Sequence, residues 1–248
     1  MQVLECEHRT HVGLVRQINQ DYLGCFGEQG VLVLADGMGG HQAGEVAARI
    51  AVETAAESLL PVQEANTADD LESMLWVGQA GEAANQAVFA AMGKDPALSG
   101  MATTLVLALF RDKRVFFAHV GDSRLYRLRD GYLRCLTRDH SLVQELLDNG
   151  IFANRKEVNA AGIGDNILTR GVGLQADVEV DVGDAEVCPG DVYLMCSDGL
   201  CGRVPDDEIR LTMLRHRGLD RIADELIEAA LETGGRDNIS LILASPQI

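Results

Sequence analysis

A short apolar run meets a glycine-rich loop in Val31-Leu32-Val33-Leu34-Ala35-Asp36-Gly37-Met38-Gly39-Gly40-His41. The apolar run, followed at once by Asp-Gly, predicts a buried strand that ends in a turn. Beyond the loop, apolar and small residues recur at helical spacing from Ala43 to Leu59, and Pro61 marks the stop, so a long helix is expected there. Asp36 therefore lies at a strand end beside Gly37, whose missing Cβ lets a backbone carbonyl turn toward a ligand.

The rest of the chain groups its strands and helices in blocks. A second helix is expected to begin after Asp69 or Asp70 and to end before Gly93. Strands are expected at residues 103–110, 115–120, 124–129, 132–136, 178–182, 192–196 and 239–244, and further helices at 141–149, 206–215 and 220–232. The tight connections in the central group predict an antiparallel meander. Blocks of this kind favour an α+β architecture with antiparallel sheets.

Length and charge limit the kinds of protein this chain can be. The chain has 248 residues, and 47% of them are apolar. Residues 1–248 can therefore bury a substantial core as a single domain. The net charge of −17 argues against nucleic acid or an anionic membrane as a partner, because such a field repels both. No segment is apolar for long enough to cross a bilayer, and residues 1–10 lack the apolar part of a signal peptide. We therefore expect no membrane insertion and a cytoplasmic location.

The six cysteines are dispersed and show no paired spacing of the zinc-binding kind. Most lie in apolar surroundings, so we expect small core residues in a reducing compartment rather than disulfides. Cys196 and Cys201 are the pair whose spacing calls for a check.

Aspartates stand at the ends of apolar runs along the whole chain. They are Asp21, Asp36, Asp122, Asp198 and Asp237. A single Asp-Gly is most simply a turn, but the recurrence at strand ends predicts that the fold gathers these residues. Gathered carboxylates would repel one another without cations, and an all-carboxylate site suits Mg²⁺ or Mn²⁺. Two such ions about 3.5–4 Å apart would bridge a water and aim it at phosphorus, so we expect hydrolysis of a phosphoester.

Two further side chains suit phosphate chemistry. Arg16 precedes Asp21, and a guanidinium can hold two phosphate oxygens in a fork, although an arginine in such a place is more often a solvated surface residue. His41 can donate a proton to a leaving alkoxide, but a surface or helix-capping histidine fits its position about equally well. The glycines of residues 37–40 lack the Lys-Ser/Thr of a P-loop, so nucleotide binding has little support.

The short motifs of the chain also follow one another in a recognisable order. They are Arg16-x-x-Asn19-Gln20-Asp21, Asp36-Gly37-Met38-Gly39-Gly40-His41, Gly100-Met101-Ala102-Thr103-Thr104, Gly121-Asp122-Ser123-Arg124, Thr137-Arg138-Asp139-His140-Ser141, Ser197-Asp198-Gly199-Leu200 and Arg236-Asp237-Asn238. With these motifs the chain resembles the metal-dependent protein serine/threonine phosphatases of the PPM, or type 2C, family in their compact bacterial form. The resemblance runs from about Arg16 to Leu243. Gln20 departs from it, because many relatives have Glu there.

The resemblance implies a fold and a metal centre. The fold would be a central sandwich of two antiparallel β-sheets flanked by helices, in four α/β/β/α layers, with a flap insertion at about residues 143–174 that helps to choose substrates. A binuclear Mn²⁺ or Mg²⁺ centre would be held by Asp21, Asp36, the Gly37 carbonyl, Asp198 and Asp237, with Asp36 bridging the ions. Asp122 and Asp198 would form a weaker third metal position. Arg16 would bind phosphate, and His41 would act as an acid or contact the substrate.

The resemblance also implies a function. We expect a cytoplasmic, monomeric phosphatase that hydrolyses phosphoserine and phosphothreonine in proteins by attack of a metal-bridged water, and that reverses a bacterial Ser/Thr protein kinase in signal transduction. A catalytically weak regulatory module would lack a metal ligand, and none is missing. A two-metal nuclease fits the carboxylates but not the acidic charge. Partner-switching phosphatases of bacterial stress signalling usually carry sensor domains, for which this chain has no room.

Overall fold

Two antiparallel sheets form the centre of the protein. The computed structural model describes residues 3–39, 43–64, 69–164, 167–216 and 218–247. The strands of the first sheet are β1 (Leu4–His11), β7 (Arg124–Arg129), β8 (Tyr132–Cys135), β10 (Val192–Cys196) and β11 (Ile239–Pro246), in the order β1-β11-β10-β7-β8. Those of the second are β2 (Asp21–Phe26), β3 (Val31–Met38), β4 (Ala102–Thr103), β5 (Leu105–Arg111), β6 (Arg114–Val120) and β9 (Asp181–Glu186), in the order β2-β3-β5-β6-β9 with β4 paired to β3.

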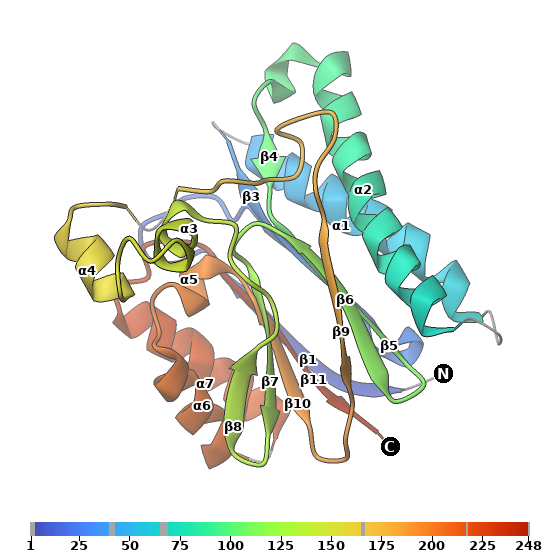
Figure 1. Cartoon of the computed structure of the whole chain (residues 1–248), viewed down its shortest axis with the longest axis vertical. Helices are drawn as coiled ribbons and strands as arrows, with labels where there is room; N and C mark the ends of the chain where they lie inside the picture. Colours follow the sequence, from blue (N-terminus) through green and yellow to red (C-terminus); the bar gives the residue numbers. More distant parts are fainter. Residues whose placement is uncertain (1–2, 40–42, 65–68, 165–166, 217, 248) are drawn as a thin grey trace.

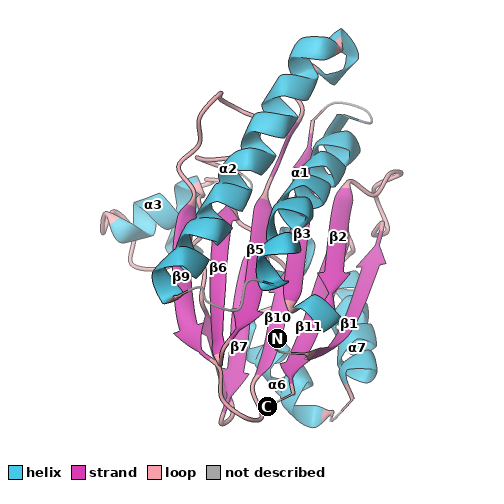
Figure 2. Cartoon of the chain, turned by 90° about the vertical axis from the view of Figure 1, so that its right-hand side faces the viewer, coloured by secondary structure: helices cyan, strands magenta, loops and turns pink. Residues whose placement is uncertain are grey.

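Helices cover the outer face of each sheet, which confirms the predicted four-layer α+β sandwich. Helices α1 (Ala43–Leu59) and α2 (Asp70–Lys94) lie on the second sheet, whereas α6 (Asp206–Arg215) and α7 (Leu219–Glu232) lie on the first (Figures 1 and 2). A third apolar layer, which includes Leu32, Phe110 and Tyr193, fills the space between the sheets. The shorter helices are α3 (Leu142–Asp148), α4 (Arg155–Ala160), α5 (Asp198–Cys201) and the 3₁₀ turns η1 (Gly27–Gln29), η2 (Pro61–Glu64) and η3 (Pro96–Leu98).

Local sequence explains the two long helices. Helix α2 begins with a capping box, in which the Glu72 amide donates to the Asp69 carboxylate (2.8 Å) and the Asp69 amide to the Glu72 carboxylate (3.3 Å). This confirms Asp69 as the predicted cap, but the helix runs past Gly93 to Lys94. On α1, alanines fill the buried face, so the helix packs closely against β3 and α2.

The predicted central meander is wrong at one connection. Strands β5 and β6 pair, as do β7 and β8, but β6 and β7 belong to different sheets. Between them Gly121 has a φ of +106°, and a Cβ there would lie 2.7 Å from the Thr104 side chain. Only glycine fits this bend, so the chain leaves one sheet for the other at the residue before Asp122.

The sequence analysis missed some strands and helices and misplaced the bounds of others. The predicted strand at residues 178–182 begins later, because β9 covers Asp181–Glu186. Strands β1 and β2 were not predicted, and neither was helix α4, which lies within the predicted flap. The predicted flap, residues 143–174, contains most of α3, all of α4 and a return segment that bridges to the body at Ser141↔Leu168 and Thr103↔Val172. No helix in the described part of the chain combines the length and hydropathy needed to span a bilayer.

Candidate metal centre

The predicted acidic residues come from strand ends that meet at one edge of the sandwich. Asp21 opens β2, and Asp36 lies near the end of β3, directly opposite it in the antiparallel register. Opposite residues in such a pair have Cβ atoms about 4.5–5.5 Å apart, so two carboxylates face each other across the ladder. Like charges in this arrangement are destabilising, which means that the site needs protons or cations.

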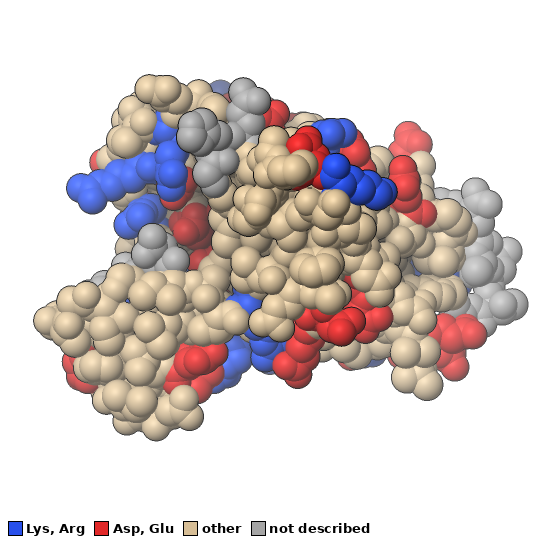
Figure 3. All heavy atoms as spheres, turned by 90° about the horizontal axis from the view of Figure 1, so that it is seen from above, with Lys and Arg blue, Asp and Glu red and all other residues tan. Residues whose placement is uncertain are grey.

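A pocket of about 200 Å³ opens beside this pair. Its lining residues are Arg16, Gln20, Asp36, Gly37, Met38, Gly39, Thr104, Asp122, Leu168, Asp198 and Asp237. Seen from above, the molecule is hollowed near its left side, with acidic atoms deep in the hollow and Lys or Arg side chains around it (Figure 3). The structure thus brings together all of the sequence-predicted site residues that it describes; Asp21 lies beside the pocket rather than in its lining. His41 lies outside the described residues.

Asp21 is buried with one oxygen unsatisfied. Ser197 Oγ donates to Asp21 Oδ2 at 2.9 Å, whereas Oδ1 is buried and has no hydrogen-bond partner among the described atoms. Burial raises the pKa of Asp21 to about 6, and the charge of Asp198 adds to this increase. Hydrogen bonding by Ser240 and Ser197 acts in the opposite direction but is outweighed. A buried carboxylate oxygen without a donor is a place that a cation can occupy.

The pKa values of Asp36, Asp122 and Asp198 are raised as well. Burial is the largest cause for these three carboxyl groups, and the neighbouring carboxylates add to it, so that the pKa of Asp36 lies well above its ordinary value and that of Asp198 is raised. The pKa of Asp122 rises to about 7 through burial and the nearby Asp198 and Asp139. Burial of several mutually repelling carboxylates is the chemistry expected of a site for hard divalent ions, and the oxygen-only donor set suits Mn²⁺ or Mg²⁺.

Gly37 is held where no side chain fits. A Cβ on Gly37 would lie 2.1 Å from the Gly44 carbonyl oxygen and 2.6 Å from that of Gln20, because α1 packs on the strand at this point. The Gly37 amide donates to the Gln20 carbonyl at 3.1 Å. The backbone itself therefore forms this part of the pocket wall.

Two threonines fix the backbone of Asp36. The Asp36 amide donates to Thr104 Oγ1 (3.0 Å), and Thr103 Oγ1 donates to the Asp36 carbonyl (2.9 Å). Thr104 Oγ1 also bonds Ser123 Oγ at 2.7 Å, which links Asp36 to the loop that carries Asp122. Both threonines belong to a motif quoted above, but the sequence alone did not give them this role.

Arg16 reaches the pocket from the loop between β1 and β2. Its guanidinium Nη2 lies 2.9 Å from Asp237 Oδ2, and its side chain is 53% exposed. The loop is held by Asn238, whose Nδ2 donates to the carbonyls of Val12 and Ile18, each at 3.0 Å. The sequence analysis assigned no function to Asn238. Its position directly after Asp237 is the one feature of the sequence that could have indicated this role.

A buried ion pair supports the loop that carries Asp122. Arg124 forks onto Asp139 with distances of 2.7 and 2.6 Å, and Arg155 of α4 adds a third bond at 2.7 Å. Burial alone would raise the pKa of Asp139, but the two guanidinium groups hold it below its ordinary value. Asp139 is therefore an anion that anchors the α4 helix to the body of the protein.

All six cysteines lie in the described part of the chain and are free thiols, including Cys196 and Cys201. They contribute no disulfide to the fold, as the sequence predicted.

Comparison with known proteins agrees with the site. The profile of the family described as Protein phosphatase 2C matches residues 14–243, and the chain belongs to this family. It is 37% identical over 243 residues to the serine/threonine phosphatase stp of Listeria monocytogenes, covering 97% of this chain and 95% of that protein. It is also 37% identical over 242 residues to the serine/threonine protein phosphatase PstP of Mycobacterium tuberculosis, covering 98% of this chain but 45% of that protein.

Solved structures show the same likeness. The catalytic domain of PstP in complex with two manganese ions superposes with a TM-score of 0.87 at 36% identity, covering 100% of both chains. The phosphatase Stp1 from Staphylococcus aureus superposes with a TM-score of 0.89 at 30% identity, covering 100% of this chain and 98% of the other.

Proposed function

We propose that this protein is a metal-dependent phosphatase that removes phosphate from phosphoserine and phosphothreonine in proteins. The observation that carries the proposal is the gathering of buried carboxylates from distant strand ends into one pocket with an arginine at its rim. Membership of the protein phosphatase 2C family and the names of the relatives support it.

The proposed ligands of two Mn²⁺ or Mg²⁺ ions are Asp21, Asp36, the Gly37 carbonyl, Asp198 and Asp237, with Asp36 shared between the ions. When bound, the ions lower the pKa of a water in the pocket and offset the charge of the phosphoryl group. Asp122 and Asp198 provide a weaker third position. The unsatisfied Asp21 oxygen and the raised pKa values of Asp36 and Asp122 support this assignment.

Arg16 is proposed to bind the phosphoryl oxygens, since its half-exposed guanidinium faces the pocket and can form a fork. The Arg16 guanidinium is paired with Asp237, and binding of a phosphoryl group would require it to turn toward the phosphate. His41 keeps its proposed part as an acid or a substrate contact. The pocket residues orient the phosphoester for direct hydrolysis, and no covalent phosphoenzyme is formed.

The physiological setting is likewise a proposal. We assign phosphorylated proteins as substrates, an opposing Ser/Thr protein kinase, a role in signal transduction, a cytoplasmic location and a monomeric single domain over residues 1–248. The net charge of −17 supports the absence of nucleic-acid partners. The segment of residues 143–174 is proposed to act as the flap that helps to select substrates, because Leu168 reaches the pocket lining from it.

Phosphopeptide hydrolysis tests the proposal. Purified protein with Mn²⁺ should dephosphorylate phosphothreonine and phosphoserine peptides faster than phosphotyrosine peptides, lose this activity on chelation and leave oligonucleotides intact. Asp198→Ala should abolish turnover, whereas Asp184→Ala, a change to an ion-paired aspartate on β9, should not. Cleavage of oligonucleotides, or turnover by Asp198→Ala equal to that of the unmodified chain, would reject it.

A further inference from the structure

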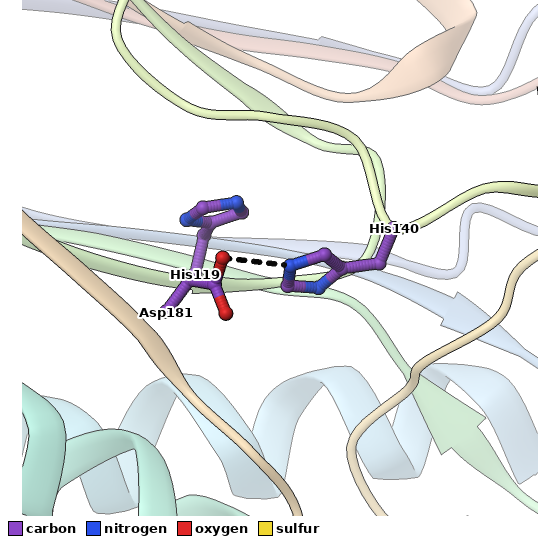
Figure 4. Close-up of side chains that lie close together, drawn as sticks. All are labelled: His119, His140 and Asp181. Carbon is purple, nitrogen blue, oxygen red and sulfur yellow. Dashed lines mark ion pairs between the residues drawn. The ribbon is translucent and has the colours of Figure 1, made fainter. Parts of the chain in front are cut away.

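A polar cluster lies near the metal pocket and is not part of its lining. It consists of His119 on β6, His140 after β8 and Asp181 at the start of β9 (Figure 4). Nitrogen and carboxylate atoms of the three side chains lie within 4.8 Å of one another. The two histidines are 4% and 7% exposed. Histidine and carboxylate side chains this close together are a donor set that many metal sites use.

The orientation of the rings argues against a shared metal ion. The imidazoles are stacked, with centroids 4.8 Å apart and an interplanar angle of 17°. A ring nitrogen binds a metal along a lone pair in the plane of its ring, so two stacked rings do not direct their lone pairs to one point. Asp181 is also neutralised already, because Arg170 Nη1 lies 2.6 Å from its Oδ1.

The hydrogen bonds of His140 define its tautomer. The Gly121 amide donates to His140 Nδ1 at 3.1 Å, so the proton of the neutral ring resides on Nε2. Nε2 faces Asp181 Oδ2 at 3.4 Å and also lies 3.3 Å from Arg170 Nη1, so that the ring N–H and the guanidinium share the Asp181 carboxylate. Because Nδ1 already accepts a hydrogen bond and Nε2 carries the proton, His140 has no free lone pair for a metal. Its side chain instead connects Asp181 to Gly121.

The backbone of His140 adds two more links. Its amide donates to the Gly121 carbonyl at 2.9 Å, and its carbonyl accepts from the Thr169 amide at 2.9 Å. Gly121 is thus bound to His140 through both of its backbone groups, directly before Asp122. Thr169 belongs to the return segment, residues 167–172, which brings Leu168 to the pocket.

Asp181 also contacts the return segment directly, through Arg170. Its carboxylate pairs with Arg170, whose Nη2 also lies 3.4 Å from Glu179 Oε2. One carboxylate on β9 therefore faces both His140, which holds the loop at Asp122, and Arg170, which belongs to the return segment. The two parts share a common support outside the metal pocket.

We propose that His140 and Asp181 are positioning residues that couple the return segment to the loop carrying Asp122. Order in one part then stabilises the binding geometry of the other, and the coupling is reciprocal because binding free energies are linked. The expected effect of this coupling on metal affinity rests on the proposed role of Asp122 as a ligand. The mechanical part of the proposal, that the contacts of His140 and Asp181 hold the two segments together, does not depend on that role.

Amide hydrogen exchange, resolved by NMR in the metal-free protein, tests the mechanical part. Asp181→Ala removes the support, so exchange at the Gly121 and Thr169 amides should become about three- to tenfold faster, as expected for the loss of one net hydrogen bond. Asp184→Ala is the matched control, since Asp184 lies on the same strand and pairs with Arg114. Unchanged exchange in Asp181→Ala, or an equal change at these two amides in Asp184→Ala, would overturn the proposal.

A second variant distinguishes coupling from general loosening. In His140→Asn the side-chain oxygen takes the place of Nδ1 and can still accept from Gly121, but the contact with Asp181 is lost. Gly121 should therefore exchange faster, as in Asp181→Ala, whereas Thr169, whose segment Asp181 still holds through Arg170, should stay better protected than in Asp181→Ala. Equal loss of protection at both amides in His140→Asn would show that the ring acts only through packing and would contradict the proposed chain of contacts.

Metal titration tests the remaining part. In calorimetric Mn²⁺ titrations, Asp181→Ala should weaken the lowest-affinity ion about three- to tenfold and leave the tighter ions unchanged. Saturating Mg²⁺ should slow Thr169 exchange in the unmodified protein but not in Asp181→Ala. Faster exchange without any change in metal affinity would overturn the coupling to Asp122 while leaving the proposed phosphatase activity standing. Tight Zn²⁺ binding that His119→Ala removes would instead establish the metal site rejected above.

Discussion

Replacing Asp21 with Asn should stabilise the metal-free protein and weaken its metal binding. Asp21 is 8% exposed, and burial with the nearby Asp198 raises its pKa from 3.8 to about 6. Ionising this carboxyl in the folded protein therefore costs about 3 kcal/mol more than in the unfolded chain. Asn removes the charge, keeps an oxygen that can accept from Ser197 and offers an N–H to the Asp36 carboxylate, which lies opposite it in the strand pair.

The gain in stability of Asp21→Asn over the unmodified protein should increase as the pH rises. Because its folded-state pKa is raised, the Asp21 carboxyl favours the folded state below about pH 4 and loses that contribution as the pH rises through about 6. Asn does not titrate. The variant should match the unmodified protein near pH 4 and be about 1–3 kcal/mol more stable at pH 8, the lower figure applying if Asp36, whose pKa is raised well above its ordinary value, stays protonated there.

Thermal unfolding after chelation measures this difference. A change of about 1–3 kcal/mol corresponds to a Tm rise of about 2–12 °C in a chain of this size. Excess Mn²⁺ should raise the Tm of the unmodified protein more than that of Asp21→Asn, since the variant lacks a ligand. Asp184→Asn, on the surface of β9, should show no pH-dependent gain. A lower Tm for metal-free Asp21→Asn at pH 8, or an equal shift at both pH values, would refute the reasoning.

Three other substitutions test separate parts of the site. Arg16→Ala should raise KM for phosphate esters about tenfold or more, with Arg16→Lys intermediate, because a charge-assisted hydrogen bond to phosphate is lost; an unchanged KM would leave Arg16 a surface residue. Gly37→Ala should cost about 1–3 kcal/mol in urea unfolding and remove the Mn²⁺-induced Tm rise, since its Cβ would meet the Gly44 carbonyl; normal Mn²⁺ binding would contradict this. Asn238→Ala should cost about 2–3 kcal/mol by leaving two loop carbonyls unpaired, and a loss below about 0.5 kcal/mol would show that water replaces the side chain.

The sequence predicted elements that bury a regular apolar face. Helix α1 follows the helical spacing of its alanines, and strand β10 has the bounds expected from its apolar run. Strands β1 and β2 were missed because charged or mixed residues alternate along them, and the apolar partner of β1 is the distant strand β11. The crossing between sheets at Gly121 was not predictable from turn chemistry, because a short Gly-Asp-Ser link also suits a hairpin.

The acidic part of the site was predictable because each aspartate stands at a strand end in a motif. The register that sets Asp21 opposite Asp36, and the contacts that hold the pocket in place, required coordinates. Thr104 and Asn238 act through hydrogen bonds to backbone groups far away in sequence. His140 is similar, since its partner Gly121 can be identified only once the two loops are seen together.

Anomalous diffraction at the manganese edge, from crystals grown with Mn²⁺, tests the central claim most directly. We predict two strong peaks about 3.5–4 Å apart in the pocket lined by Asp36, Asp198 and Asp237, within reach of the unsatisfied Asp21 oxygen. An absence of peaks in that pocket at saturating Mn²⁺, or strong peaks at the His119, His140 and Asp181 cluster instead, would contradict the account.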